Sequence, residues 1–401
     1  MGLDAATGGL SRHGTQKAAS TEPAARLAGS AGPGIETDAA VFADRQSGAQ
    51  TPPAPGSFSI FWITDTQFLS ETNPGLFRRM NRWILNNWAA YNGKLVIHTG
   101  DLVEDGSVPE QWEKAGEAMN MFLQNGIPYT WCAGNHDDLV LGDQFSGWIG
   151  NQAGAPALDP NAVSSHVNGN NYPTGNETAD SQATAAGYAQ WVGDFNNGMD
   201  TALRFTANGL DFLVINLEWN AAQPALQWAE NILDDPRFSD HNAIIAPHAY
   251  VNARGQVYDP SQGIIMETFL RGFVSLLNAH PNVFLTLSGH FATDFGYFSP
   301  SPVRGRNQLM FDRQDRCDFG SYLADNDPDL IPPDRSKVGG ATVTILNFDT
   351  VRNLIHVSTY DVYTGQWRVD YGNQYSVVMF ANPPLQQSSS DASPAIAGLP
   401  A

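Results

Sequence analysis

Five apolar segments of this chain are each followed by residues of the kinds that bind metal ions. Residues 58–63 are apolar apart from one serine, and Asp65-Thr66-Gln67 follows them after Thr64. The clusters after the other four segments are Gly100-Asp101-Leu102-Val103-Glu104-Asp105-Gly106, Gly134-Asn135-His136-Asp137, His248 and Ser288-Gly289-His290. The carboxyl ends of the strands in an α/β sheet border one crevice. If the apolar segments are strands of such a sheet, the five clusters can meet in one place.

The spacing of apolar residues predicts strands and helices in alternation. Apolar residues recur at helical spacing over residues 74–88, and a second helix is expected over residues 111–124. The expected strands are residues 58–63, 95–98, 129–133, 212–217, 243–246 and 283–287, and an antiparallel pair over residues 341–348 and 354–360. Alternation of this kind favours an α/β fold in which a layered sheet is flanked by helices.

Three segments lack this pattern. Residues 1–57 are rich in Ala, Gly, Ser, Thr and Pro, and contain too few apolar residues to offset the entropy of the chain. We expect them to form a disordered arm or a processed leader, with residues 58–381 as the folded domain and residues 382–401 as a similar tail. Alternatively, the arms order against a neighbouring chain and support self-association. Residues 138–197, rich in Gly, Asn and Ala, are expected to form surface loops.

The charge of the chain limits its partners. Asp and Glu number 41 against 21 Lys and Arg, which gives a formal net charge of −20. So acidic a surface repels polyanions and argues against a nucleic-acid footprint. No run of eighteen apolar residues predicts a membrane span. The sequon at Asn176 accepts a glycan only outside the cytoplasm, so an extracytoplasmic location is favoured over a cytoplasmic one.

The residue types in the five clusters match one kind of chemistry. Carboxylates, amide oxygens and imidazoles bind divalent metal ions, and a carboxylate between two ions can bridge them. Two ions about 3.5–4 Å apart can hold a phosphate and generate a hydroxide at neutral pH. The sequence therefore predicts a two-metal hydrolytic site. A small phosphorylated substrate would be drawn in by the metal ions, since the surface is not basic.

In order and type, the clusters resemble the motifs of the calcineurin-like metallophosphoesterase family. The resemblance covers residues 58–295, and members whose first motif reads Asp-Thr-Gln are especially similar. It implies a four-layer sandwich, in which a central β-sandwich is flanked by helices, and a dinuclear centre. The ligands that it implies are Asp65 and Gln67 for the first metal, Asp101 as the bridge, and Asn135, His248 and His290 for the second metal.

The resemblance also implies a general acid. His136 would lie near the phosphate and protonate the leaving alkoxide, and Glu104 would orient its ring. A lone Gly-Asn-His sequence is a weak match, whereas five motifs in the family's order are specific. The remaining histidines are expected to lie outside the site, as surface or core residues. They are His98, His166, His241, His280 and His356.

Three positions depart from the commonest form of the family. Gln67 stands where a histidine is usual, Ala292 stands where a second histidine would follow His290, and Glu104 replaces an aspartate. The cofactors expected are two divalent ions from among Mn, Mg, Fe, Zn and Ca, with the first site the weaker. Its oxygen ligands favour Mg, Mn or Ca over Zn. Asp294 lies near enough in sequence to substitute for the missing histidine.

Two functions follow from these residues. In the first, the chain is a metal-dependent phosphoric ester hydrolase that cleaves a phosphomonoester or a phosphodiester. In the second, catalysis has been lost and the domain serves as a structural or binding module. One form of this alternative is an extracellular module that assembles with copies of itself. The Asn135-His136 pair favours the enzyme, because a degraded site has no need of the acid. The absence of a histidine at position 292 favours the module.

Overall fold

The computed structural model describes residues 53, 55–137, 188–259, 265–292, 297–300, 306–314, 340–369 and 372–380. These residues belong to one compact unit, which spans Arg45–Ala401. The α-helices are α1 (Gln67–Thr72), α2 (Pro74–Asn87), α3 (Pro109–Gln124), α6 (Gln223–Leu233) and α7 (Glu267–Ala279), and the short 3₁₀ helices are η3 (Asn196–Gly198) and η4 (Pro236–Phe238). The expected arm, tail and most of the loop at 138–197 lie outside the described residues.

The first sheet is built around β1. Its strands are β1 (Phe58–Ile63), β2 (Gly93–His98), β3 (Tyr129–Trp131), β11 (Thr342–Asp349), β12 (Leu354–Asp361), β13 (Gln366–Arg368) and β14 (Gln374–Val378). The order along the sheet is β13-β12-β11-β1-β2-β3, and β14 pairs with β12. β1, β2 and β3 run parallel, whereas β11 is antiparallel to β1. The carboxyl ends of β1, β2 and β3 therefore share one edge of the sheet.

The second sheet has its own parallel centre. Its strands are β4 (Ala189–Phe195), β5 (Asp200–Ala207), β6 (Leu210–Leu217), β7 (Asn242–Pro247), β8 (Val283–Ser288), β9 (Tyr297–Pro300) and β10 (Asn307–Met310). They follow the order β4-β5-β6-β7-β8-β10-β9. β6, β7, β8 and β10 run parallel to one another. Their carboxyl ends likewise share one edge.

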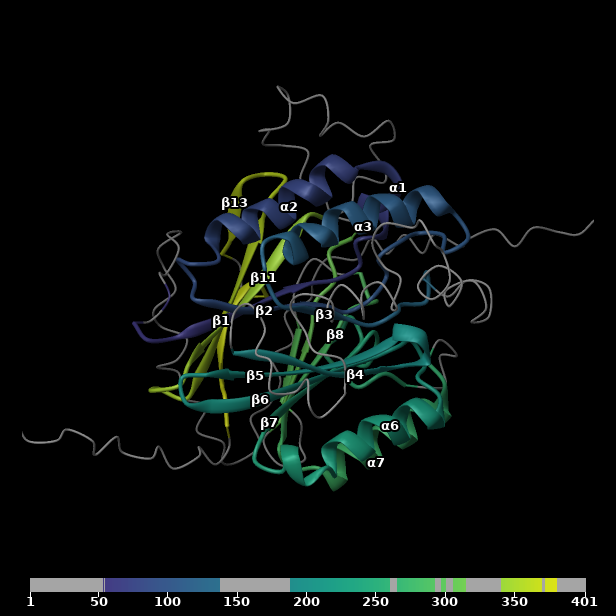
Figure 1. The fold of residues 1–401 in the computed structure, drawn as a ribbon, viewed down its shortest axis with the longest axis vertical. Helices are drawn as coiled ribbons and strands as arrows, with labels where there is room; N and C mark the ends of the chain where they lie inside the picture. Colours follow the sequence, from purple (N-terminus) through teal and green to yellow (C-terminus); the bar gives the residue numbers. More distant parts are fainter. Residues whose placement is uncertain are drawn as a thin grey trace, which may run out of the picture. The chain divides into compact units, whose positions relative to one another are not determined.

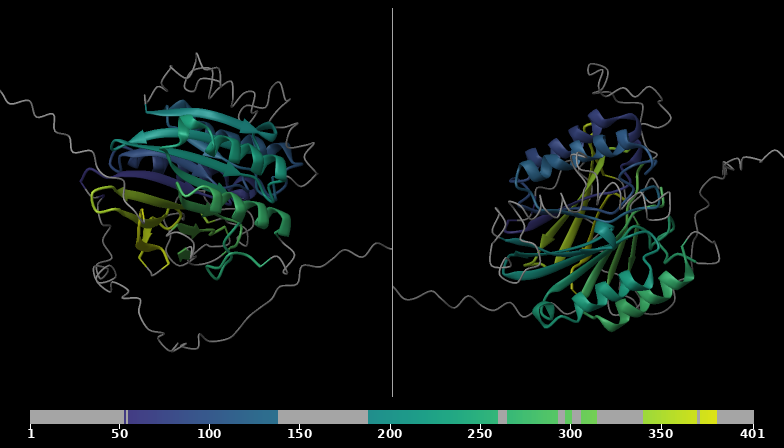
Figure 2. Two further views of the ribbon diagram at one scale, coloured as in Figure 1. Left: turned by 90° about the horizontal axis from the view of Figure 1, so that it is seen from below. Right: turned by 45° about the vertical axis from the view of Figure 1, so that its right-hand side comes forward.

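The two sheets face each other, and helices cover both outer faces (Figure 1). Helices α1, α2 and α3 lie over the first sheet, and α6 and α7 lie over the second; the right-hand view of Figure 2 shows these four layers. Strands covered on both faces need apolar residues on both, which explains why β1 is apolar at every position except Ser59. Phe58 packs toward the second sheet against Phe205 and Phe212, whereas Phe61 packs outward against Trp83 and Trp88 of the α2 segment.

This architecture confirms the predicted α/β sandwich flanked by helices. The predicted helices correspond to α2 and α3, and each predicted strand corresponds to a strand of the structure. The sequence predicted surface loops over residues 138–197, and this prediction was wrong for residues 189–195, which form β4. That strand forms because its backbone pairs with β5, with Ala189 and Trp191 turned inward, although Gly and Asn residues surround it in the sequence. Within the described part of the chain, no helix has the length and apolar character that crossing a bilayer requires.

The packing of Phe58 predicts a large loss of stability on truncation. Its side chain is fully buried and also stacks on Phe348, with ring centroids 4.8 Å apart. Phe58→Ala should lower the free energy of unfolding by about 3–5 kcal/mol, because it removes buried area and leaves a cavity between the sheets. Urea denaturation measures the change. The control is Val351→Ala, since Val351 is 77% exposed and its truncation should cost less than about 0.5 kcal/mol. Similar losses in both variants would contradict this packing.

Candidate metal centre

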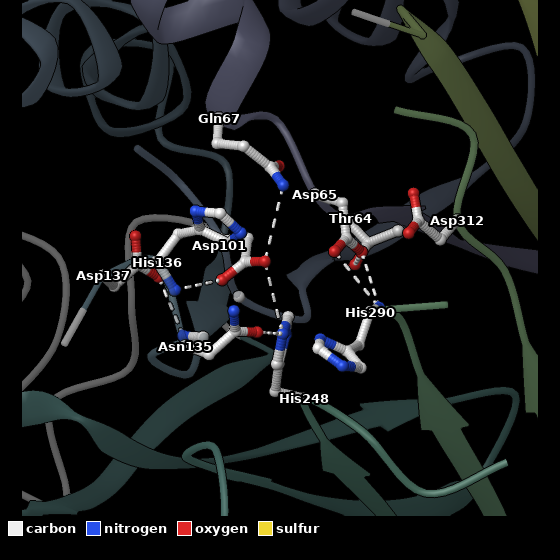
Figure 3. A network of polar contacts seen from close by, with 12 residues as sticks. Thr64, Asp65, Gln67, Asp101, Asn135, His136, Asp137, His248, His290 and Asp312 are labelled. Carbon is white, nitrogen blue, oxygen red and sulfur yellow. Dashed lines mark hydrogen bonds and ion pairs between the residues drawn. The ribbon is translucent and has the colours of Figure 1, made fainter. Parts of the chain in front are cut away.

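Polar residues from both sheets meet at the shared edge where the parallel strands end (Figure 3). Asp65 follows β1 and Asp101 follows β2, while Asn135 and His136 follow β3. From the second sheet, His248 follows β7 and His290 follows β8. The structure thus brings the five clusters into one network, as the order of strands and motifs predicted.

Asp101 and two histidines form the tightest group. One ligand atom from each of Asp101, His248 and His290 lies within 4.8 Å of the others. His248 Nε2 is 3.4 Å from Asp101 Oδ2 and 3.0 Å from Asn135 Oδ1. This combination of carboxylate, amide oxygen and two imidazoles is a donor set for a divalent transition metal.

The tautomer of His248 suits it to bind a metal. Its Nδ1 lies 2.7 Å from the carbonyl oxygen of Thr99, which can only accept a hydrogen bond, so Nδ1 carries the proton. Nε2 is then left to face Asp101 and Asn135. A hydrogen bond to the far ring nitrogen is the usual way in which a protein orients a histidine ligand. The ring of His290 is held differently, by packing on Trp219 with ring centroids 4.4 Å apart.

Asp65 joins the network from the first strand. Both of its carboxylate oxygens accept from the backbone N–H of His290 at 3.1 Å, and Thr64 Oγ1 donates to Oδ2 at 2.5 Å. This contact connects the first sheet to the second, because Asp65 follows β1 and His290 follows β8. It holds the Asp65 carboxylate at the same edge as Asp101.

Three of these residues have left-handed backbone conformations, which non-glycine residues rarely adopt. The φ angles are 51° at Asp65, 55° at Asp101 and 72° at His290. Such strain persists only where the surrounding structure enforces it, and it is concentrated at functional sites. The strained positions here coincide with the candidate ligands.

Glycines beside the ligands allow the close approach. A Cβ at Gly134 would lie 2.0 Å from Asp101 Oδ1, and a Cβ at Gly289 would lie 2.2 Å from Asp65 Oδ2. At Gly100, which has a φ of 94°, a Cβ would lie 2.6 Å from His248 Nδ1. The glycines that the sequence places next to the ligands thus form a cradle that any larger residue would fill.

The electrostatics of the site reflect buried carboxylates. Burial alone would raise the pKa of Asp101, but the charge and hydrogen bond of His248 outweigh it and lower the pKa to about 2. Burial would likewise lower the pKa of His248, but Asp101 and Asp65 raise it to about 10. Burial, reinforced by Asp101, raises the pKa of Asp65 to about 7. Burial and the charge of His248 lower the pKa of His290 to about 3.

These shifts show that the buried acids require a positive charge beside them. The raised pKa of His248, caused by Asp101 and Asp65 in spite of burial, reflects this requirement. A metal ligand must be the neutral imidazole, so a divalent ion at this corner would replace the proton. The residues therefore suit a metal ion in two ways: their donor atoms are ones that metal ions bind, and their buried carboxylates need a positive charge nearby.

Gln67 lies at the other side of Asp101. Its Nε2 is 3.4 Å from Asp101 Oδ2 and also donates to Oε1 of Gln314. Its Oε1 is buried and has no hydrogen-bond partner among the described residues. A buried amide oxygen that accepts no hydrogen bond can instead bind a metal ion, so Gln67 Oε1 fits a ligand of the first metal. Ala292 is exposed, and Asp294 lies outside the described residues.

His136 lies at the rim of the network. Its backbone N–H donates to Asp101 Oδ1 at 2.9 Å, and its ring turns toward Glu104. Nδ1 is 3.0 Å from the Glu104 carbonyl oxygen and 3.3 Å from Glu104 Oε2. Burial would lower the pKa of His136, but Asp101, the Glu104 carbonyl and the Glu104 carboxylate raise it above the usual value. The His136 side chain is 32% exposed, so the ring is accessible to a bound molecule.

Two carboxylates have roles that the sequence did not indicate. Asp137 accepts from the backbone N–H groups of Leu102, Val103 and Gly134 at 2.8–3.1 Å, and so joins the loops after β2 and β3. The sequence feature that could have indicated this role of Asp137 is its place at the end of the Gly134-Asn135-His136-Asp137 cluster. Asp312, which follows β10, is fully buried, and its Oδ1 accepts from the backbone N–H of Gln314 at 2.9 Å.

The other described histidines lie outside this metal group. His98 is fully buried beneath it, with Nε2 2.9 Å from Thr66 Oγ1, and burial lowers its pKa to about 3. His280 contacts the Leu276 carbonyl oxygen. His241 and His356 are likewise elsewhere in the fold, and His166 falls outside the described residues.

Comparison with known proteins gives a family match. The model of the calcineurin-like phosphoesterase family matches residues 58–291. An uncharacterised protein of Bacillus subtilis, YvnB, is 26% identical over 352 residues, which are 85% of this chain. The chain spans 23% of the length of that relative.

Two solved structures are similar to the chain at low identity. The purple acid phosphatase PPD1 from yellow lupin (Lupinus luteus) seeds is 13% identical, with a TM-score of 0.46 over 82% of this chain and 56% of its own. GAP50, the anchor in the inner membrane complex of Plasmodium, is 13% identical, with a TM-score of 0.43 over 81% of this chain and 90% of its own. Neither similarity assigns a substrate to the chain.

Because Gly134 packs closely against Asp101, we predict that a methyl group at position 134 will not fit. Gly134→Ala should displace Asp101 or its loop and lower the free energy of unfolding by about 1–3 kcal/mol, as overpacking does. It should also reduce bound metal. Gly193→Ala is the matched control, because no atom lies within 4 Å of a Cβ there. Urea denaturation and elemental analysis measure both effects. Unchanged stability and metal content in Gly134→Ala would contradict the close approach.

Proposed function

Because the chain belongs to the calcineurin-like phosphoesterase family, we propose that it is a metal-dependent hydrolase of a phosphomonoester or phosphodiester, acting at two divalent ions. The observation that carries this proposal is the convergence of Asp101, His248 and His290, whose ligand atoms lie within 4.8 Å of one another. These residues come from both sheets, and chance surface acids and histidines would not gather at one buried edge.

The residues divide into two metal sites. Asn135, His248 and His290 would hold the second ion, Asp65 and Gln67 the first, and Asp101 would bridge them. When bound, the ions stabilise negative charge on the phosphate and activate the attacking water. The chain supplies their positions, through the hydrogen bond from His248 to Thr99 and the N–H of His290 on Asp65.

His136 is proposed to provide the proton for the leaving group. Its Nδ1 proton is engaged by the Glu104 carbonyl oxygen, which leaves Nε2 to carry the second proton of the imidazolium. Asp101 and Glu104 raise the pKa of His136 in spite of burial, which favours the protonated ring. A positioned acid of this kind donates to the departing alkoxide.

The substrate is proposed to be a small phosphorylated compound. The net charge of −20 opposes the approach of a polyanion such as DNA or RNA. Attraction for phosphate would come from the ions at the buried edge, where the carboxylates and imidazoles converge.

Removal of a second-site ligand tests the metal assignment and the activity together. The parent, cleared of metal by a chelator, should regain hydrolysis of a chromogenic phosphate ester with Mn or Mg. His248→Ala should fail to retain the second ion, because it loses the imidazole that faces Asp101. Elemental analysis and the chromogenic assay measure these outcomes. His280→Ala is the control, since His280 lies outside the site, and should keep both metal and activity.

Full metal content in His248→Ala would contradict the ligand assignment. A parent that binds metal but hydrolyses neither monoesters nor diesters with Mn, Mg, Zn or Ca would favour a binding module over an enzyme.

The acid role of His136 predicts a dependence on the leaving group. His136→Ala should lower turnover about 10²–10⁴-fold for esters of poorly acidic alcohols. The loss should shrink for nitrophenyl esters, because their leaving groups depart without a proton. Metal content should stay at the parent level, since the ring contacts Glu104 and lies outside the metal group. Steady-state kinetics over a series of leaving groups measures the effect. An equal loss for good and poor leaving groups would rule out proton donation by His136.

A further inference from the structure

The loop after β2 holds His136 at two points. The Glu104 carbonyl oxygen lies 3.0 Å from His136 Nδ1, and since a carbonyl oxygen can only accept, Nδ1 carries the proton. Two residues further on, the backbone N–H of Gly106 donates to the His136 carbonyl oxygen at 3.1 Å. The orientation of the His136 ring therefore depends on how firmly these three loop residues, the 104–106 segment, are held.

Gln111, in the first turn of α3, holds the 104–106 segment from the helix side. Its Oε1 accepts from the backbone N–H groups of Glu104 at 2.8 Å and of Asp105 at 3.0 Å. Gln111 is 6% exposed, so its amide is largely shielded from water. The neighbouring Trp112 donates from Nε1 to the Gly106 carbonyl oxygen at 2.9 Å. The start of α3 thus fixes both ends of the segment that contacts His136.

Gln111 and His136 contact opposite sides of one peptide group. The N–H of Asp105 and the C=O of Glu104 belong to the same planar unit, so they cannot turn independently of each other. Gln111 Oε1 accepts from the N–H, and His136 Nδ1 donates to the C=O. A hydrogen bond at one end of a peptide group also polarises the other end, which strengthens the bond made there. Gln111 therefore both orients and strengthens the acceptor that holds the His136 ring.

This use of Gln111 differs from the usual role of a glutamine at a helix start. A glutamine at the third helical position commonly caps its own helix, by accepting from the backbone N–H of the residue before the helix. In α3 that residue is Val108, and its N–H donates instead to the Asp105 carbonyl oxygen at 2.9 Å. The Gln111 amide oxygen is thereby committed to the loop and not to the helix.

We propose that Gln111 is a positioning residue for His136, which it holds through the peptide group between Glu104 and Asp105. The inference rests on the proposed function, in which His136 protonates the leaving alkoxide, and deepens it. Proton transfer requires the ring to lie within hydrogen-bond reach of the leaving oxygen, and a small misplacement of a catalytic group costs much of its effect. The contacts of Gln111 are with the loop, so its effect reaches the reaction through His136.

Gln111→Met tests this role, because it keeps the size of the side chain and removes the acceptor. Turnover of esters of poorly acidic alcohols should fall about 10–100-fold, less than removal of the ring itself costs. Nitrophenyl esters should lose less than about twofold, because their leaving groups depart without a proton. Gln111→Glu keeps acceptor oxygens and should restore turnover. Gln124→Met is the matched control, since Gln124 is an exposed glutamine at the far end of α3.

A double-mutant cycle separates positioning from a general structural effect. In a His136→Ala background, Gln111→Met should cause no further loss, because the ring that it positions is absent. Elemental analysis should show the metal content of the parent in every variant. If urea denaturation shows that Gln111→Met is unfolded in the assay, Gln111→Asn replaces it, because its amide is one carbon shorter and cannot reach both N–H groups.

Three results would overturn the positioning role while leaving the proposed function intact. They are a further loss in the His136→Ala background as large as in the parent, an equal loss for good and poor leaving groups, and a Gln111→Glu variant as slow as Gln111→Met. A parent that hydrolyses neither class of ester would instead overturn the proposed function, and this inference with it.

Discussion

The arrangement of the site depends on the burial of the Asp101 carboxylate where the two sheets meet. Asp101 is 1% exposed, and its oxygens are contacted by the His136 backbone N–H and by His248 Nε2. A buried charge without compensation is strongly destabilising. The residues around Asp101 therefore had to be donors or cations, and the pKa of about 10 at His248, which Asp101 and Asp65 raise against the effect of burial, is the consequence. A divalent ion satisfies the same requirement with more charge.

Holding ligands so close together requires a strained backbone. Left-handed φ angles at Asp65, Asp101 and His290 cost roughly 1–3 kcal/mol each, and Gly134 and Gly289 stand where no side chain fits. The sandwich can support this strain because its centre is rigid. Phe58 and its aromatic neighbours fill the space between the sheets, and the parallel strands that end at the site are covered on both faces. The core that stabilises the fold is thus also what fixes the ligands.

Much of this could be predicted from the sequence, because each ligand cluster follows a long apolar strand. The positions of Asp65 and His290 are local consequences of β1 and β8, and Gly289 next to His290 was informative. Asp312 gave no such signal. β10 is a four-residue strand of mixed polarity, Asn307–Met310, and it reaches the site only because it pairs with β8 after β9 has turned back. A residue that nonlocal strand pairing brings to the site cannot be recognised from local spacing, and the metal roles themselves remain predictions.

The division of ligands also bears on how an acidic protein would attract phosphate. The histidine corner would hold its ion with neutral rings, whereas the corner of Asp65 would hold its ion with oxygen ligands. Two divalent ions would carry four positive charges against the two carboxylates of Asp65 and Asp101, so the loaded site would be positive within a chain of net charge −20. Opposite charges at short range in a buried edge interact far more strongly than charges across water. Attraction would therefore be confined to the site, so that a small phosphate ester is drawn in while a long polyanion is repelled by the surface around it.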